Sequence, residues 1–156
     1  MELQTERLKL IPCTEESAAA AALNNYELGP HIKMYLAELK SDPTLLGWGV
    51  WFVIDKDTNT VIGDIGFKGK PNMEKTVEVG YGIKSSARNK GYATKAVKEI
   101  IAWAFSSDEV ATVIAECRED NYPSMKVLEK LNMEQTGKEG HMLRWQIFKE
   151  KRDVPN

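Results

Sequence analysis

Residues 80–105 read "GYGIKSSARNKGYATKAVKEIIAWAF", and the pattern of apolar residues changes within this stretch. Up to Ile83 apolar and small residues alternate, which is typical of a strand with one buried face. A basic turn of small residues follows. From Tyr92 onward the apolar residues recur with the period of an amphipathic helix. The stretch therefore predicts a strand, a short basic turn and a helix.

The turn has the properties of an anion-binding site. Almost no side-chain oxygen stands before the helix to cap its first amides, which carry partial positive charge. Gly91 lets the backbone approach a ligand closely, and Ala93 keeps the second position small. Arg88 and Lys90 add positive charge. The turn therefore predicts a bound phosphate at the helix N-terminus.

Two common phosphate-binding motifs do not fit this turn. The Walker A motif requires Gly-Lys-Ser/Thr, but Tyr92 follows Gly91. The dinucleotide motif requires its glycines in the turn, whereas Gly80 and Gly82 lie inside the predicted strand. Nucleotide phosphoryl transfer and dinucleotide binding are therefore disfavoured.

Composition indicates one globular domain over residues 1–156. Apolar residues make up 42% of the chain and charged residues 28%, and the net charge is −2. This charge disfavours a nucleic-acid surface or an anionic membrane as partner. No apolar run reaches membrane-spanning length, and the N-terminus does not resemble a signal peptide. We expect a cytoplasmic protein without nucleic-acid or membrane partners.

The cysteines do not indicate a disulfide or a metal site. Cys13 and Cys117 lie far apart in the sequence and lack CxxC spacing, so we expect both to be reduced and structural. The chain has only two histidines, His31 and His141. We therefore expect no metal.

The remaining elements are read from local pattern. We expect the following order: a strand ending at Pro12 at the edge of the sheet, helices over 14–25 and from Pro30 to about 40, strands over 49–55, 61–69 and 75–83, the helix after the turn, a strand over 111–117, a helix over 121–132, and a hairpin over 133–150. This order predicts an α+β domain with a mixed, mostly antiparallel sheet flanked by helices.

The turn also carries a family resemblance. The hexapeptide "RNKGYA", residues 88–93, fits R/Q-x-x-G-x-G/A and resembles motif A of the GNAT superfamily of N-acetyltransferases. In that family the loop binds the pyrophosphate of acetyl-coenzyme A. The later segment "ECREDNYPSMKVLEKLNM" is similar to the family's strand, N-x-x-S/A motif and short helix. "TERLKLIP" and "EVGYGI" resemble the branch that includes the ribosomal-protein alanine N-acetyltransferases.

The resemblance spans nearly the whole chain in order, and implies the acyl-CoA N-acyltransferase fold. It also implies which residues bind the coenzyme: Ile83, Arg88, Asn89, Lys90, Gly91, Tyr92, Ala93, Thr94 and Asn121. Asn121 is also expected to cap the helix that follows it. Backbone groups near Ile83 are expected to pair with the pantetheine amides as an added strand would.

Two residues are candidates for the chemistry of acetyl transfer. Glu78 is the candidate base: it lies on the strand face of Gly80 and Gly82, and the resemblance places this strand beside the thioester. An exposed strand carboxylate predicts the same alternation. Ser124, three residues after Asn121, is the candidate acid for the departing thiolate, although serine is also common in a first helical turn.

The chain departs from the family pattern at two places. "LNM", residues 131–133, replaces the usual "LGF", and Asn132 is still able to adopt the left-handed conformation. Many relatives also have a tyrosine seven residues after the asparagine as general acid. Leu128 occupies that position here, so no tyrosine donates a proton from it.

The acceptor site is less defined by the sequence. In this family residues 26–50 shape it, and His31, Tyr35 and Glu38 lie there, although each residue type is more often found at the surface or in packing. Asp64 is expected at the surface, with orientation of an amine as the alternative. Tyr81 is expected in the core. Three tryptophans, Trp51, Trp103 and Trp145, are expected to be structural, whereas Trp48 has both a pocket and a core interpretation.

The resemblance implies an acetyl-CoA-dependent N-acetyltransferase with acetyl-CoA as co-substrate and direct transfer in a ternary complex. The acceptor is a primary amine, either a protein N-terminus or a small amine. The alternative is a non-catalytic acyl-CoA-binding or regulatory module, which Leu128 keeps open. Monomer and homodimer both remain open.

Overall fold

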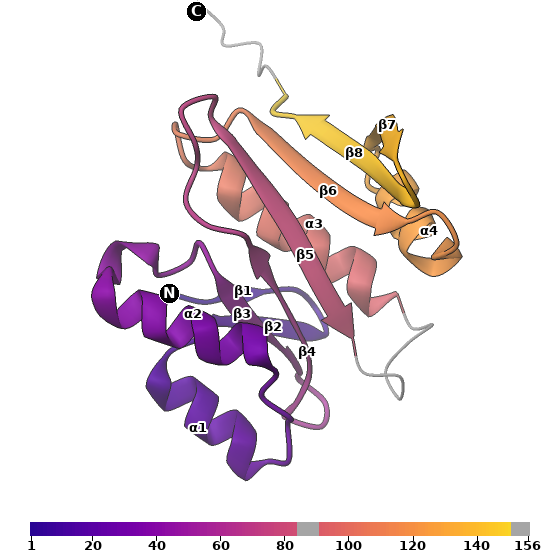
Figure 1. Ribbon diagram of the computed structural model, residues 1–156. Coiled ribbons are helices and arrows are strands. Elements are labelled where there is room, and N and C mark those ends of the chain that lie inside the picture. Colours follow the sequence, from indigo (N-terminus) through magenta and orange to yellow (C-terminus); the bar gives the residue numbers. More distant parts are fainter. Residues whose placement is uncertain (84–90, 151–156) are drawn as a thin grey trace, which may run out of the picture.

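The computed structural model describes residues 1–83 and 91–150, and its elements form an α+β domain (Figure 1). The strands are β1 (Leu3–Gln4), β2 (Leu8–Pro12), β3 (Val50–Asp55), β4 (Thr60–Phe67), β5 (Thr76–Ile83), β6 (Thr112–Arg118), β7 (Glu134–Glu139) and β8 (Met142–Phe148). The helices are α1 (Glu15–Leu23), α2 (Pro30–Ser41), α3 (Tyr92–Phe105) and α4 (Tyr122–Lys130), with a short 3₁₀ turn at Pro43–Leu45.

One sheet holds all eight of these strands in the order β1-β2-β3-β4-β5-β6-β8-β7. Neighbouring strands are antiparallel except β5 and β6, which are parallel. The prediction of a mixed, mostly antiparallel sheet flanked by helices is therefore confirmed. No helix among the described residues is long and apolar enough to span a membrane.

The first strand of the sequence prediction is divided in two. A two-residue strand, β1, lies outside β2, so β2 is not the edge strand that Pro12 predicted. Because β1 pairs only with Lys9 and Leu10, the missing N–H of Pro12 disturbs no pairing with β1. Pro12 itself faces Trp51 of β3.

Local signals fixed the helix ends as predicted. Thr14 accepts a hydrogen bond from the Ser17 amide at 3.1 Å and forms a capping box with it. Pro30 occupies the first position of α2. The Asn121 side chain caps α4, and Asn132 has a φ of 62° after its end, in the left-handed region.

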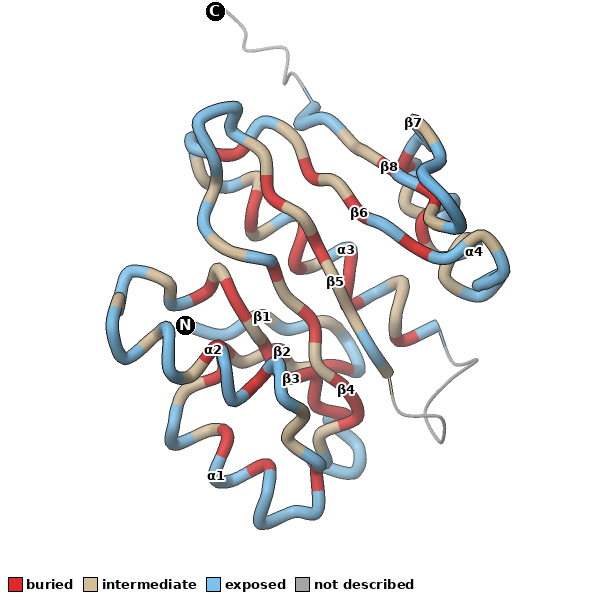
Figure 2. Tube along the Cα trace, in the orientation of Figure 1, coloured by how far each residue is buried: buried red, intermediate tan, exposed pale blue. Residues whose placement is uncertain are grey.

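Two hydrophobic clusters lie on opposite faces of the sheet. Phe52 packs with α1 and α2 through Ala18, Ile32 and Tyr35, whereas Trp51 packs against α3 on the other face. Figure 2 shows that the buried positions follow the sheet and the helix faces turned toward it. The strand β7 at the sheet edge has no buried residue.

Both cysteines are free and buried, as the sequence predicted. Cys13 belongs to the cluster of α1 and α2, and Cys117 belongs to the cluster of α3. Burial, with a smaller contribution from the charge of Asp64, raises the pKa of Cys13 to about 12. Burial also raises the pKa of Cys117. Both side chains therefore stay protonated thiols at neutral pH.

The parallel pair β5 and β6 separates part-way along its length. Thr76, Val77 and Glu78 pair with β6, but β5 continues to Ile83 and β6 to Arg118 without further pairing to each other. Figure 1 shows the two strands diverging toward the side on which α4 lies. The divergence opens the middle of the sheet.

Candidate active site

A groove of about 520 Å³ occupies the place where β5 and β6 separate. It lies between the end of β5, the N-terminus of α3 and helix α4. Seven residues predicted to bind coenzyme or to react with it line this groove: Ile83, Gly91, Tyr92, Ala93, Thr94, Asn121 and Ser124. The other three predicted coenzyme residues, Arg88, Asn89 and Lys90, lie outside the described residues.

The N-terminus of α3 opens into this groove. Gly91 precedes the helix with a φ of 75° and gives no side-chain cap. Glycine adopts this left-handed conformation without steric cost. The Tyr92 side chain is only 3% exposed and its hydroxyl donates to Asp55, so Tyr92 offers the groove its main chain. The helix therefore presents backbone amides with partial positive charge to the groove.

Ser124 lies in the first turn of α4, where Asn121 caps its amide at 3.2 Å. Its Oγ lies 2.7 Å from the hydroxyl of Tyr81, which reaches it from β5. Burial raises the pKa of Tyr81, and the hydrogen bond with Ser124 lowers it in part. Tyr81 packs against the core, as expected, but it is only partly buried and also lines the groove. Leu128 is 1% exposed and serves packing.

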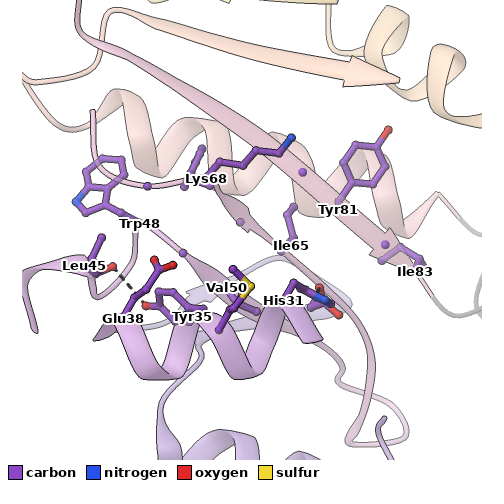
Figure 3. A pocket seen from close by; sticks show the side chains of 18 of the residues that line it. His31, Tyr35, Glu38, Leu45, Trp48, Val50, Ile65, Lys68, Tyr81 and Ile83 are labelled. Carbon is purple, nitrogen blue, oxygen red and sulfur yellow. Dashed lines mark hydrogen bonds and ion pairs between the residues drawn. The ribbon is translucent and has the colours of Figure 1, made fainter. Parts of the chain in front are cut away.

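A larger cavity of about 820 Å³ lies between the sheet and α2 (Figure 3). His31, Tyr35 and Glu38 from α2 all line it, as does Trp48. His31 and Glu38 are exposed and Tyr35 is buried in the cluster of Phe52, as their residue types predict, and all three also line the cavity. Trp48 packs against the core and also lines the cavity. Trp48 also packs against Trp103 with ring centroids 4.6 Å apart. Trp51 is fully buried, as predicted.

Asp64 departs from its sequence expectation. Its side chain is only 19% exposed and lines the larger cavity rather than the surface. The Tyr26 hydroxyl donates to its Oδ2 at 2.5 Å, and His31 Nε2 lies 2.8 Å from its Oδ1. Burial and this hydrogen bond raise the pKa of Tyr26, which therefore stays a donor. Sequence reasoning missed Tyr26, although a lone carboxylate within "VIGDIGF" signals a polar partner.

Glu78 is partly buried and forms an ion pair with Lys68. Lys68 Nζ lies 2.5 Å from Glu78 Oε2, and the Glu78 side chain is 21% exposed. Lys68 lines the larger cavity, whereas Glu78 is not among the described residues that line either cavity. The base role of Glu78 stays a prediction.

The two cavities meet on one short segment of β5. Tyr81, Gly82 and Ile83 line both of them. A ligand in the groove and a ligand under α2 therefore come together across these three residues. This arrangement suits a transfer reaction between two separately bound molecules.

Comparison with known proteins agrees with this geometry. The family model described as an acetyltransferase (GNAT) domain matches residues 7–134. The chain belongs to this family. A Bacillus subtilis protein named uncharacterized N-acetyltransferase YjdG is 34% identical over 99 residues, which cover 64% of this chain. The chain spans only 59% of the length of that relative.

Solved structures show that the fold is that of GNAT acetyltransferases. The ribosomal-protein-S5-alanine acetyltransferase from Vibrio fischeri matches with a TM-score of 0.75 and 18% identity, over 95% of this chain and 96% of that one. The spermidine N-acetyltransferase from Vibrio cholerae, in complex with CoA and spermine, matches with a TM-score of 0.71 and 14% identity, over 92% and 96% of the two chains.

The described part of this GNAT domain has no cluster of three or more His, Cys, Asp or Glu side chains that could hold a metal ion. Among the cavity residues, Asp64 is paired with His31, and Lys68 is paired with Glu78, which lies outside both linings.

Glycines in the GNAT sheet shape the larger cavity. A Cβ at Gly66 would lie 1.8 Å from the carbonyl oxygen of Gly49, a backbone contact that cannot adjust by a rotamer change. A Cβ at Gly49 would lie 1.9 Å from the ring of Tyr35. These glycines let β3, β4 and α2 approach closely at the cavity floor.

Gly66→Ala is expected to lower the free energy of unfolding by about 2 kcal/mol or more, because the added methyl forces β3 and β4 apart. Gly80→Ala is the matched control. A Cβ at Gly80 meets no described atom within 4 Å, so its stability should stay within about 0.5 kcal/mol of wild type. Urea unfolding of both variants measures the difference. Equal stabilities would contradict the close approach at Gly66.

Proposed function

We propose that this GNAT domain is an acetyl-CoA-dependent N-acetyltransferase that transfers an acetyl group directly to a primary amine in a ternary complex. The observation that supports it most is the junction of the two cavities on Tyr81, Gly82 and Ile83. The groove takes the coenzyme, and the cavity under α2 takes the amine. The acetyl group then lies at the junction.

The groove suits coenzyme A from end to end. The pyrophosphate binds the amides from Gly91 to Thr94, with Arg88, Asn89 and Lys90 supplied by the preceding segment. Beyond Glu78 strand β5 no longer pairs with β6, so the pantetheine arm has space to run beside the backbone as far as Ile83. Asn121 adds a polar side chain to the groove wall.

The reaction needs a neutral amine and a stabilised leaving group. The amine nitrogen attacks the thioester carbonyl, a C–N bond forms and the C–S bond breaks, so that one proton leaves the nitrogen and one joins the thiolate. Ser124 supports the thiolate with its hydroxyl, which Tyr81 holds at 2.7 Å. The N-terminal end of α4 adds partial positive charge there.

Glu78 is the proposed proton acceptor, acting through water molecules between it and the amine. It lies on the same face of β5 as Gly80 and Gly82, which contribute no side chains to fill the space between. Its carboxylate forms an ion pair with Lys68.

The acceptor class follows from the relatives and the cavity. Two structural neighbours are named for acetylation of a ribosomal-protein alanine and of spermidine. A primary amine, at a protein N-terminus or in a small molecule, fits both precedents and the open cavity under α2.

The direct test is thiol release from acetyl-CoA in the presence of a panel of primary amines. We expect turnover, and we expect Ser124→Ala to lower kcat about tenfold or more while the dissociation constant of coenzyme A changes less than twofold. The protein's own thiols should add little to the thiol signal of this assay, because Cys13 and Cys117 are both buried. The exposed Ser41→Ala is the control and should behave as wild type.

Two outcomes would contradict this proposal in different ways. Tight coenzyme binding without thiol release on any amine would favour a non-catalytic acyl-CoA-binding module. Absence of coenzyme binding would overturn both assignments.

Glu78→Gln tests the base. We expect kcat/KM at neutral pH to fall about a hundredfold, and the acidic limb of the pH profile to lose one ionisation, since the amide cannot accept a proton. The exposed Glu74→Gln in the preceding turn is the control, with an unchanged profile. A Glu78→Gln enzyme with the wild-type rate and acidic limb would remove Glu78 from the mechanism.

A further inference from the structure

Asp64 on β4 lies where the two cavities meet. It is directly opposite Gly82 in the antiparallel pairing of β4 with β5, so both positions face the same side of the sheet. Gly82 lines both cavities, and a Cβ there would meet no described atom within 4 Å. The Asp64 carboxylate therefore borders open space at the junction.

Two neighbours fix the orientation of this carboxylate. Tyr26 donates to one oxygen at 2.5 Å, and His31 lies 2.8 Å from the other. A carboxylate accepts about four hydrogen bonds, so these two partners leave acceptor positions for a ligand. Because the side chain is 19% exposed, a ligand in the cavity can reach it. The Asp64 carboxylate is therefore fixed in orientation by its two neighbours and is accessible to a ligand in the cavity.

The wall of the larger cavity is complementary to a cation. Its described lining has three carboxylates, Glu27, Glu38 and Asp64, against one lysine, Lys68, which is paired with Glu78 outside the lining. The histidine of the lining, His31, lies against Asp64. A negative wall attracts amines in their protonated form.

The rest of the cavity is apolar and extends away from the junction. The side chains that form this part are Tyr35, Leu45, Trp48, Val50, Ile65 and Phe67. Figure 3 shows Trp48 and Leu45 at one end and His31 and Ile83 at the other. An amine held at Asp64 therefore has an apolar space in which to place its body.

We propose that Asp64 binds the ammonium group of the acceptor at the junction, and that the acceptor is a cationic primary amine with an apolar body directed toward Trp48. This inference rests on the proposed function for the identity of the cavity as the acceptor site. Glu78 does not compete for this role, since it lies four residues before Gly82, about 13 Å along the strand. Asp64 selects and positions the amine, and Glu78 serves the later proton transfer.

The test compares 2-phenylethylamine with 2-phenylethanol, which has the same apolar body without the charge. Binding to the full chain with coenzyme A at neutral pH is followed through the indole N–H signal of Trp48, identified with Trp48→Phe. We expect wild type to bind the amine at least about tenfold more tightly than the alcohol, as expected for a charge-assisted hydrogen bond.

Asp64→Asn should abolish the preference for the amine and leave alcohol binding unchanged. The matched control Asp108→Asn, an exposed aspartate outside the cavity lining, should keep the preference. Should Asp64→Asn fail to fold, the carboxyl carbon signal of Asp64 in wild type decides: it should shift with the amine and not with the alcohol. Equal affinities in wild type, no saturable binding of the amine, or a retained preference in Asp64→Asn would overturn the proposal.

The outcome also separates this inference from the proposed function. An Asp64-dependent preference for the amine without its acetylation would keep the binding site and contradict the enzymatic assignment. Acetylation of the amine with no dependence on Asp64 would keep the enzyme and overturn the binding site.

Discussion

The parting of β5 from β6 is the constraint on which the rest of the site depends. Three residue pairs hold the strands together, and beyond Glu78 each strand continues without the other. Beyond this point β5 stays paired with β4, and its other edge borders the groove instead of β6. In the proposed function, a pantetheine arm with its two amides runs along that edge. The helix N-terminus at Gly91 stands at the end of the same opening, and its amides are the proposed site of the pyrophosphate.

The two faces of β5 differ in the size of their side chains. Gly80 and Gly82 leave the α2 face open, whereas Tyr81 on the other face extends toward α4 and contacts Ser124. One strand thereby separates two ligands and joins them at a single point. The two cavities also differ in charge. The groove begins at the positive end of helix α3, whereas carboxylates and apolar side chains mainly line the larger cavity. In the proposed function, this division keeps an anionic coenzyme and a cationic acceptor on separate sides of β5.

The sequence predicted the features that local rules control. The alternation in β5, the helix period after Gly91, and the caps at Thr14 and Asn121 each depend on neighbours within a few residues. The residues at the start of α3 that the sequence predicts to bind coenzyme line one groove, and their binding role stays a prediction.

Long-range packing controls what the sequence did not predict. Tyr26 and Asp64 are 38 positions apart, and only the placement of α1 and α2 over β4 brings them together. Tyr81 has the same alternation as Val77 and Val79, so its pattern predicts a core residue. Its hydroxyl lies beside Ser124 because β5 and β6 diverge, and the alternation of apolar residues does not predict that divergence.

The most direct measurement is a titration of ¹⁵N-labelled protein with coenzyme A, followed through the backbone amide signals. The account predicts that the large shifts gather on Tyr81–Ile83, on Gly91–Thr94 and on the first turn of α4, since these amides line the groove. Large shifts confined to other parts of the sheet, or no shifts with saturating coenzyme, would contradict the claim that the opening between β5 and β6 is the coenzyme site.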